Sequence, residues 1–417
     1  MPNPLAWRPT RSLADEFSPR ANSIGLLRLL LAVSVLVAHA GPLGYGLANY
    51  GFAFTRGQLD FGGLGVYGFF ILSGFLITAS GMRFSLPRYA WHRFLRIFPG
   101  YWVCLVVMAC VLLPIVSLYE RGTLAGFWTH PNGPFDYVWR NLITVQNQFT
   151  ISGLMSGNPS GGAVNGSLWT LLYELMCYAM VGILAWTAVL RRTPRLVALM
   201  TAVVYLFVVS DWVRQLPVPN TWLYRRGDIG PYPVLGVFSV NSVLFLGLMF
   251  LLGASMHLYR DRIPMHPAVA AGAGLAFVGS AAFGGFLAIG PLAYAYLLVW
   301  LACKLPRWTQ GVGRKRDYSY GIYIYAYPVQ QLLALMGGAR WGVAAYIGLS
   351  LAGTLLLAVP SWFLVEKPAM SLKNWTPRAL AKRADPEPAP EPVPALPQVS
   401  IPTQRKAPET AAAPVGR

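Results

Sequence analysis

The 417-residue chain has little charge, because Asp, Glu, Lys and Arg together make up only 12% of its residues. Soluble globular proteins carry about twice that share, roughly 25%. Hydrophobic residues make up 55% of the chain, and its mean hydropathy is +0.48. The scarcity of charge therefore excludes a soluble enzyme and a disordered protein, and it predicts a protein embedded in a lipid bilayer.

Acidic residues and cysteines are especially scarce. The 15 Asp and Glu stand against 33 Lys and Arg, which gives a formal net charge of +18. In a membrane protein such an excess is typical of cytoplasmic loops, so we expect no nucleic-acid partner. The four cysteines all lie in apolar stretches, and none has the CxxC spacing of a metal or redox site. We therefore expect buried thiols, no disulfide scaffold and no metal.

Long apolar runs fill most of the chain. A helix needs about 20 apolar residues to cross the bilayer core. Ten runs approach this length, at 24–43, 62–81, 98–118, 168–190, 196–210, 236–257, 267–284, 286–303, 318–336 and 341–365. The sequence therefore predicts an all-α integral membrane protein with about ten transmembrane helices.

The distribution of basic residues predicts the orientation of these helices. With the N-terminus in the cytoplasm, 26 of the 33 Lys and Arg fall on the cytoplasmic side. Because cytoplasmic loops accumulate Lys and Arg, we expect both termini there. The chain then divides into a cytoplasmic segment 1–23, a membrane domain 24–368 and a Pro/Ala-rich disordered tail 377–417. Two segments, 119–167 and 211–235, would form ordered caps on the outer side.

The first apolar run carries two polar side chains, Arg28 and His39. Charged groups inside a span are costly and are therefore functional candidates. Their spacing of eleven residues is about three helical turns, so both lie on one face, roughly 16.5 Å apart along the axis. The alternative is an arginine that reaches the interface and a histidine bonded to a neighbouring helix. Ala38 and Ala40 also resemble a signal-peptide cleavage site, but Arg28 inside the run favours a retained helix.

Two further segments near the cytoplasmic side attract attention. The small residues of GVYGFFILSGFLI, at 65–77, favour close helix packing over a chemical role. The loop expected after it contains HRFLRIFPGYW, at 92–102, in which Arg93 and Arg96 would share a face. Paired guanidinium groups suit phosphate oxygens. The alternative is ordinary cytoplasmic positive charge.

Glu174 is a carboxylate two turns into the fourth apolar run, near its outer end. A buried charge needs a partner, and we expect His39 or an arginine. The alternative is a purely structural ion pair. The tyrosines of the ninth run, among them Tyr323, could form an aromatic wall for a ligand or simply pack between helices. Glu366 and Lys367, which end the last run, predict an ion pair at the inner surface.

In this order the motifs resemble the acyltransferase-3 family of integral membrane proteins. The matching pieces are Arg28 with His39, GVYGFFILSGFLI, HRFLRIFPGYW, NGSLWTLLYE at 165–174, YSYGIYIYAYPV at 318–329 and VEKP at 365–368. The resemblance implies transfer of an acyl group, usually acetyl from acetyl-CoA, to a hydroxyl of a cell-surface glycan. Known acceptors include O-antigen, exopolysaccharide and lipo-oligosaccharide. It also implies a location in the bacterial inner membrane.

The resemblance implies a role for individual residues. His39 would be the catalytic histidine and Arg28 its motif partner, while Arg93 and Arg96 would lie at the acyl-CoA entrance. We expect acceptor contacts from the aromatic residues Trp169, Tyr173 and Tyr323. Two departures stand out. His92 occupies a position where many members have Lys or Arg, and many relatives carry an SGNH-type domain where this chain has its Pro-rich tail.

One mechanism agrees with these roles. Neutral His39 would remove the proton of an acceptor hydroxyl as it attacks the thioester, and Glu174 would orient the imidazole. Direct transfer is favoured, with an acyl-histidine intermediate as the other possibility. Two alternatives remain: succinyl transfer to a periplasmic glucan, and a transporter or flippase. The sequence contains no inverted repeat of the kind many transporters show, and it determines neither the acceptor nor the oligomeric state.

Overall fold

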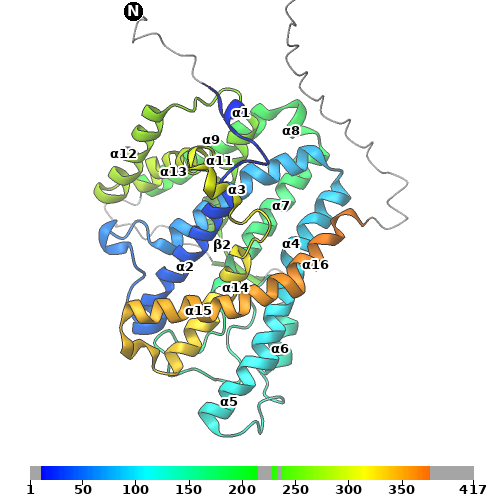
Figure 1. Cartoon of the computed structure of the whole chain (residues 1–417), viewed down its shortest axis with the longest axis vertical. Coiled ribbons are helices and arrows are strands. Elements are labelled where there is room, and N and C mark those ends of the chain that lie inside the picture. The colour runs from blue at the N-terminus through cyan, green and yellow to red at the C-terminus, as the bar shows by residue number, and fades with distance from the viewer. Residues whose placement is uncertain (1–10, 215–227, 233–235, 376–417) are drawn as a thin grey trace, which may run out of the picture.

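The computed structural model describes residues 11–214, 228–232 and 236–375, and this part of the chain is mostly helical (Figure 1). The longer helices are α2 (Ile24–Tyr45), α3 (Phe61–Arg83), α4 (Leu86–Val107), α7 (Thr170–Trp186), α9 (Pro194–Arg214), α11 (Val240–Leu258), α12 (Pro267–Phe283), α13 (Phe286–Lys304), α14 (Ser319–Leu335) and α15 (Val343–Ser361). The shorter ones are α1 (Leu13–Glu16), α5 (Leu113–Arg121), α6 (Pro134–Arg140), α8 (Val189–Arg192) and α16 (Lys367–Ser371).

Within the described residues, eight helices are long and apolar enough to cross a membrane. They include α4 and α5, joined by a π-helical turn (Met108–Leu112), and α15 and α16, joined by another (Trp362–Glu366). The two other predicted spans correspond to α12 and α14, which have only 17 residues each. A multi-pass membrane protein is therefore supported. The count of ten spans and the cytoplasmic location of both termini stay predictions, and the tail 377–417 lies outside the described residues.

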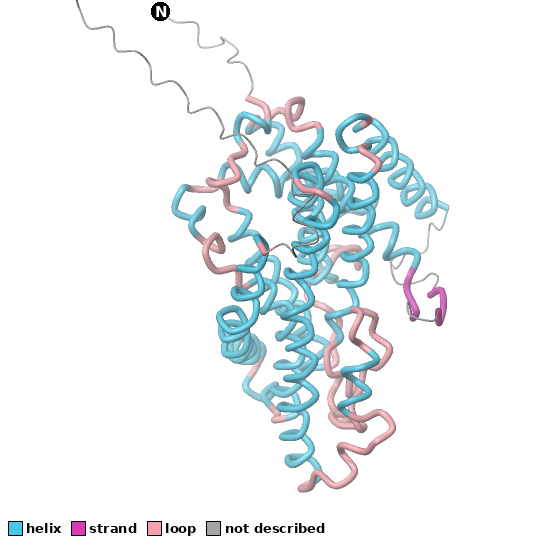
Figure 2. Tube along the Cα trace, turned by 90° about the vertical axis from the view of Figure 1, so that its right-hand side faces the viewer, coloured by secondary structure: helices cyan, strands magenta, loops and turns pink. Residues whose placement is uncertain are grey.

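Two short strands are the exception to the helical fold. Strands β1 (Asp228–Tyr232) and β2 (Gly236–Ser239) pair antiparallel between α9 and α11, with Ile229 opposite Phe238 (Figure 2). Strand β1 belongs to the predicted outer segment 211–235, most of whose other residues are outside the described part of the chain. Strand β2 takes up the first four residues of the span predicted at 236–257, so the helix begins only at Val240.

The prediction that HRFLRIFPGYW lies in a loop is wrong. Helix α4 begins at Leu86 and contains the whole segment, including Pro99. The reason is that this part of the helix alternates buried residues, such as Tyr89 and Leu95, with basic ones. A search for continuous apolar runs finds only the second half of such an amphipathic helix.

The sequence predicts that successive connecting segments lie on opposite sides of the membrane, and the positions of four short helices agree with this. Figure 1 places α1 and α8, both predicted to be cytoplasmic, at one end of the molecule, and α5 and α6, predicted to be external, at the other.

The predicted break between the seventh and eighth apolar runs is confirmed. It lies at Gly284 and Gly285, whose φ angles of 116° and 85° favour glycine.

The outer segment 119–167 is mostly irregular (Figure 2). Hydrogen bonds of buried amide side chains hold it in place. Asn141 Nδ2 donates to the carbonyl of Gln148 at 2.9 Å, and its Oδ1 accepts from two backbone amides. Asn165 Nδ2 donates to the carbonyl of Ile324 on α14 at 2.7 Å. Gln331, also on α14, donates to the carbonyls of Gly161 and Ala163. The Asn141 bonds therefore brace the segment internally, and the bonds of Asn165 and Gln331 attach it to α14.

Helices α3 and α11 cross in close backbone contact. A Cβ added at Gly74 would lie 2.0 Å from the carbonyl oxygen of Phe250, and one at Gly253 would lie 2.0 Å from that of Ile71. The small residues of 65–77 therefore serve helix packing, as the sequence predicted. This crossing holds α3, which forms one wall of the site described below.

We predict that Gly253→Ala destabilises the protein, because the new methyl group collides with the α3 backbone. The expected loss is about 1–3 kcal/mol, measured as a lower unfolding temperature of the detergent-purified protein. Gly247→Ala is the matched control, since it lies in the same helix and its Cβ would meet no atom within 4 Å. An equal shift in both variants would contradict the packing argument.

Candidate active site

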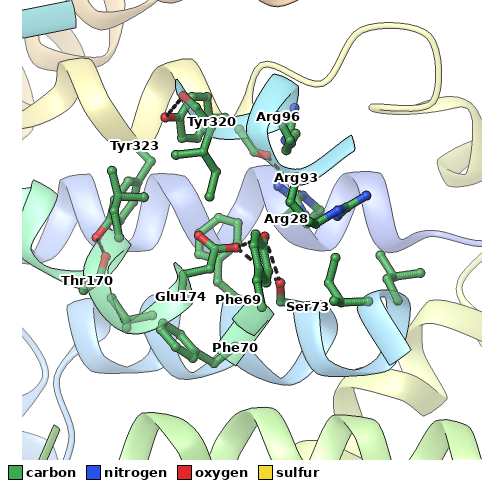
Figure 3. Close-up of a pocket in the computed structure, with 17 residues that line it drawn as sticks. Arg28, Phe69, Phe70, Ser73, Arg93, Arg96, Thr170, Glu174, Tyr320 and Tyr323 are labelled. Carbon is green, nitrogen blue, oxygen red and sulfur yellow. Dashed lines mark hydrogen bonds between the residues drawn. The ribbon is translucent and has the colours of Figure 1, made fainter. Parts of the chain in front are cut away.

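Five helices enclose a pocket with a volume of about 100 Å³ (Figure 3). It is lined by Arg28 from α2; Val66, Phe69, Phe70, Ser73, Leu76 and Ile77 from α3; Arg93, Arg96 and Ile97 from α4; Thr170, Leu171, Glu174 and Tyr178 from α7; and Ser319, Tyr320 and Tyr323 from α14. Five residues that the sequence singled out in four separate segments thus meet at one cavity. They are Arg28, Arg93, Arg96, Glu174 and Tyr323.

Asp317, two residues before the first residue of α14, links the arginines at the mouth of the pocket. Its Oδ2 lies 2.7 Å from Arg96 NH2 and 3.4 Å from Arg28 Nε. Burial raises the pKa of Asp317, but the two guanidinium groups and hydrogen bonds from Ser319 outweigh it and lower the pKa to about 2. The carboxylate is therefore charged at neutral pH, and its contribution to stability is lost only as the pH falls from about 4 towards 2.

Arg96 is also attached to the last transmembrane segment. Its NH1 lies 3.9 Å from Oε2 of Glu366, a residue that is only 3% exposed. The ion pair predicted at the end of the last apolar run therefore exists, with Arg96 as the partner of Glu366. Two carboxylates thus hold the Arg96 guanidinium in place.

Arg93 has a different environment, although it lies only one turn from Arg96. Its guanidinium carbon is 5.7 Å from the centre of the Tyr178 ring, and its Nε is buried without a hydrogen-bond partner. No carboxylate forms an ion pair with Arg93 in the part of the chain that the structure describes. Arg93 is therefore the arginine of this pocket whose charge is available to an anionic ligand.

The expected partner of Glu174, His39 or an arginine, is wrong for the described residues. Glu174 Oε1 accepts hydrogen bonds from the hydroxyls of Ser73, at 3.2 Å, and Tyr178 (Figure 3). Two hydroxyl donors satisfy the carboxylate without a basic partner. The Tyr178 ring also contacts the Arg93 guanidinium. By holding the Tyr178 hydroxyl, Glu174 therefore fixes the position of the ring against which Arg93 packs.

The end of the pocket away from the arginines is closed by Tyr323 and Thr170. Figure 3 shows these two at one end, the three arginines at the other and Glu174 between them. The Tyr323 hydroxyl is hydrogen-bonded to Thr170 Oγ1 and donates to the carbonyl of Ser167 at 2.7 Å. This arrangement joins α14 to the first turn of α7.

His39 lies outside the pocket lining, beyond this closed end. Its ring packs edge-to-face against Tyr327, with centroids 5.5 Å apart. Tyr327 is one turn of α14 past Tyr323, a rise of about 6 Å. The Tyr327 ring also lies close to Gly166, where an added Cβ would be only 2.7 Å from the ring. Glycine at position 166 therefore leaves room for the Tyr327 ring. The Nδ1 atom of His39 is buried and has no hydrogen-bond partner among the described residues.

The other two predicted acceptor residues lie elsewhere. Trp169 is 41% exposed and packs edge-to-face on Tyr173, with centroids 5.5 Å apart. The Tyr173 hydroxyl accepts a hydrogen bond from the backbone amide of Ser239, the last residue of β2 and the N-cap of α11. The structure brings neither residue to the pocket, and their role in acceptor binding stays a prediction.

The sequence profile of the family described as the acyltransferase domain, acyltransferase-3, matches residues 22–363. The chain belongs to the acyltransferase-3 family. The expectation of an acyltransferase enzyme is thereby confirmed.

Two curated relatives cover most of the chain. Nodulation protein 10 of Rhizobium leguminosarum bv. viciae is 31% identical over 383 residues, which cover 86% of this chain and 96% of the relative. An O-acetyl transferase of Shigella phage Sf6 is 27% identical over 355 residues, covering 84% and 96% respectively. No solved structure matches the chain.

Sequence reasoning missed three residues that organise the site. Asp317 was overlooked because it lies just before an apolar run, although an acid beside Arg314, Lys315 and Arg316 is a signal for an ion pair. Tyr178 lies four residues after Glu174, a spacing that places both on one helix face. Tyr327 was treated as one of several similar tyrosines, and nothing in the sequence separates it from them.

We predict that the two arginines of the RxxR motif differ in their effect on stability. Arg96→Gln removes the charged partner of Glu366 and one of the two charged partners of Asp317, and it should lower the free energy of unfolding by roughly 1–3 kcal/mol. Arg93→Gln removes no ion pair and should cost less than about 1 kcal/mol. Thermal unfolding of both purified variants measures the difference. Equal losses would show that Arg96 has no special structural role.

Proposed function

We propose that the protein is a membrane-bound O-acyltransferase that moves an acetyl group from acetyl-CoA to a hydroxyl of a cell-surface glycan. The observation that carries the proposal is the convergence of Arg28, Arg93 and Arg96 on one pocket, whose far end at Tyr323 lies one turn of α14 before Tyr327, the aromatic neighbour of His39. The O-acetyl transferase relative and the family membership support this type of reaction.

The pocket between the arginines and Tyr323 is the proposed donor site. Its mouth offers the uncompensated charge of Arg93, with Arg28 beside it, to the diphosphate of acetyl-CoA. Its walls are apolar side chains of α3, which suit the pantetheine arm. The arm would extend along the roughly 16.5 Å between Arg28 and His39 on α2, and Tyr323 must rotate away from Thr170 to admit it.

His39 is the proposed general base. Because its Nδ1 has no hydrogen-bond partner among the described residues, this nitrogen is available to accept a proton. The acceptor oxygen attacks the thioester carbonyl carbon and gives its proton to His39. The carbon–sulfur bond then breaks, the acetyl group remains on the acceptor as an ester, and the proton passes to the departing CoA sulfur. In the alternative route through an acyl-histidine, a ring nitrogen of His39 would first displace the CoA sulfur and carry the acetyl group, and the acceptor oxygen would then displace that nitrogen.

The acceptor is proposed to arrive from the opposite side of the membrane. His39 lies towards the end of α2 that leads to the outer segment, and Ser160 of that segment donates to the carbonyl of Pro42 on α2 at 2.8 Å. Aromatic side chains of this side, among them Trp169 and Tyr173, would contact the sugar. We place the protein in the bacterial inner membrane, with acyl-CoA supplied from the cytoplasm.

We predict that His39→Ala lowers the transfer of label from acetyl-CoA to glycan by at least about 100-fold. The measurement uses purified protein in lipid and cell-envelope glycan as acceptor, together with the mass of esters on glycan from cells. His266→Ala is the matched control, because that histidine is exposed and caps α12. Full activity in His39→Ala would overturn the mechanism. Loss of a succinyl instead of an acetyl ester from the cells would identify another donor.

We also predict that Arg93→Gln raises KM for acetyl-CoA by about tenfold with kcat nearly unchanged. The lost contact is a charge-assisted bond to the donor alone. Arg88→Gln is the control, since Arg88 lies on the same helix but outside the pocket, with its guanidinium over the Phe84 ring. Steady-state kinetics at several donor concentrations distinguish the two. An unchanged KM in Arg93→Gln would exclude this pocket as the donor site.

A further inference from the structure

Two hollows adjoin the mouth of the pocket, one of about 270 Å³ and one of about 430 Å³. The smaller shares Arg28 and Leu76 with the pocket, and the larger shares Ser319 with it. Both are bounded by the start of α2 and by the loop 310–318. We name the two hollows together the vestibule.

The vestibule carries positive charge that the described residues do not neutralise. Arg20 and Arg314 line the smaller hollow, and Lys315 and Arg316 line the larger. All four are exposed, and none forms an ion pair within the described ranges. Asp317 is the one carboxylate among the lining residues, and Arg28 and Arg96 already bind it. The surface therefore attracts an anion.

The loop that carries these cations is held firmly against α2. Ser23 Oγ and Thr309 Oγ1 are 2.6 Å apart in a buried hydrogen bond. The backbones also touch, since a Cβ at Gly25 would lie 2.2 Å from the carbonyl oxygen of Val312. The basic side chains thus project from a fixed backbone, which lowers the conformational entropy lost on binding a ligand.

We propose that the vestibule binds the 3′-phosphoadenosine end of the acyl-CoA donor, with Arg314 and Lys315 pairing with the 3′-phosphate. The inference rests on the proposed function and adds a second anion subsite to it. Acyl-CoA carries phosphate at two places, the diphosphate and the ribose 3′ position. A donor whose diphosphate lies at Arg28 and Arg93 must leave the pocket through the vestibule. Tyr318, which lines the larger hollow, offers an aromatic face to adenine.

The test compares binding of coenzyme A and 3′-dephospho-coenzyme A to the purified full-length protein in lipid nanodiscs, by calorimetry. The wild type should bind coenzyme A about tenfold more tightly, because one charge-assisted phosphate contact is worth roughly that factor. In the double variant Arg314→Gln/Lys315→Gln this ratio should fall below about threefold, with the dephospho ligand bound as before. Arg20→Gln should lower the ratio to a smaller extent.

Arg192→Gln/Arg307→Gln is the matched control. It removes the same charge from exposed positions outside the vestibule, so it should keep the tenfold ratio. Equal binding of the two ligands by the wild type, or an unchanged ratio in Arg314→Gln/Lys315→Gln, would overturn the subsite. An equal fall in the control would also overturn it, since the basic residues would then act only through net charge. Absence of any coenzyme A binding would instead contradict the proposed function.

Discussion

The arrangement of the site depends on one buried carboxylate. Asp317 lies two residues before α14, and it contacts Arg28 on α2 and Arg96 on α4. Three elements far apart in the sequence are thereby fixed around one cavity. Unpaired charges at this depth would be costly, so the ion pairs define which arginine remains available. Arg96 is held by Asp317 and Glu366, whereas Arg93 lies over the Tyr178 ring and has no carboxylate partner in the described part of the chain. Two apparently equivalent arginines of one motif therefore differ: Arg96 is held in ion pairs, and Arg93 is the one that the proposed function assigns to the donor.

A second constraint separates the arginine pocket from His39. The hydrogen bonds of Tyr323 to Thr170 and Ser167 close the pocket one helical turn before Tyr327, the aromatic neighbour of the histidine. For an enzyme that receives a reactive thioester on one side and a hydroxyl on the other, such a closed junction prevents wasteful hydrolysis. It also explains how α14 can serve two purposes. One stretch of the helix lines the arginine pocket, and the next stretch contacts His39 and the outer segment.

Membership in the acyltransferase-3 family favours an enzyme over a transporter. A transporter or flippase agrees with many spans and buried charges, but the chain belongs to a family of acyltransferases. Under the proposed function the arginine pocket holds the CoA part of the donor, so its lining would not by itself distinguish acetyl from succinyl. Selection of the acyl group would then fall to the region between Tyr323 and His39. Selection of the acceptor would fall to the outer segment, which hydrogen bonds of Asn141, Asn165 and Gln331 hold in place.

The sequence by itself determined the membrane class, most of the helices, and the residues Arg28, Arg93, Arg96, Glu174 and Tyr323 as a candidate set. It could do so because charge inside apolar runs is rare and each instance stands out. The start of α4 escaped notice because an amphipathic helix interrupts an apolar run with basic residues. Only the tertiary structure decided which side chains meet: Glu174 with Ser73 and Tyr178, Asp317 with two arginines, and His39 with Tyr327. The physical reason is that a buried polar group takes whichever partner helix packing brings within reach, and spacing along the chain carries no information about contacts between helices.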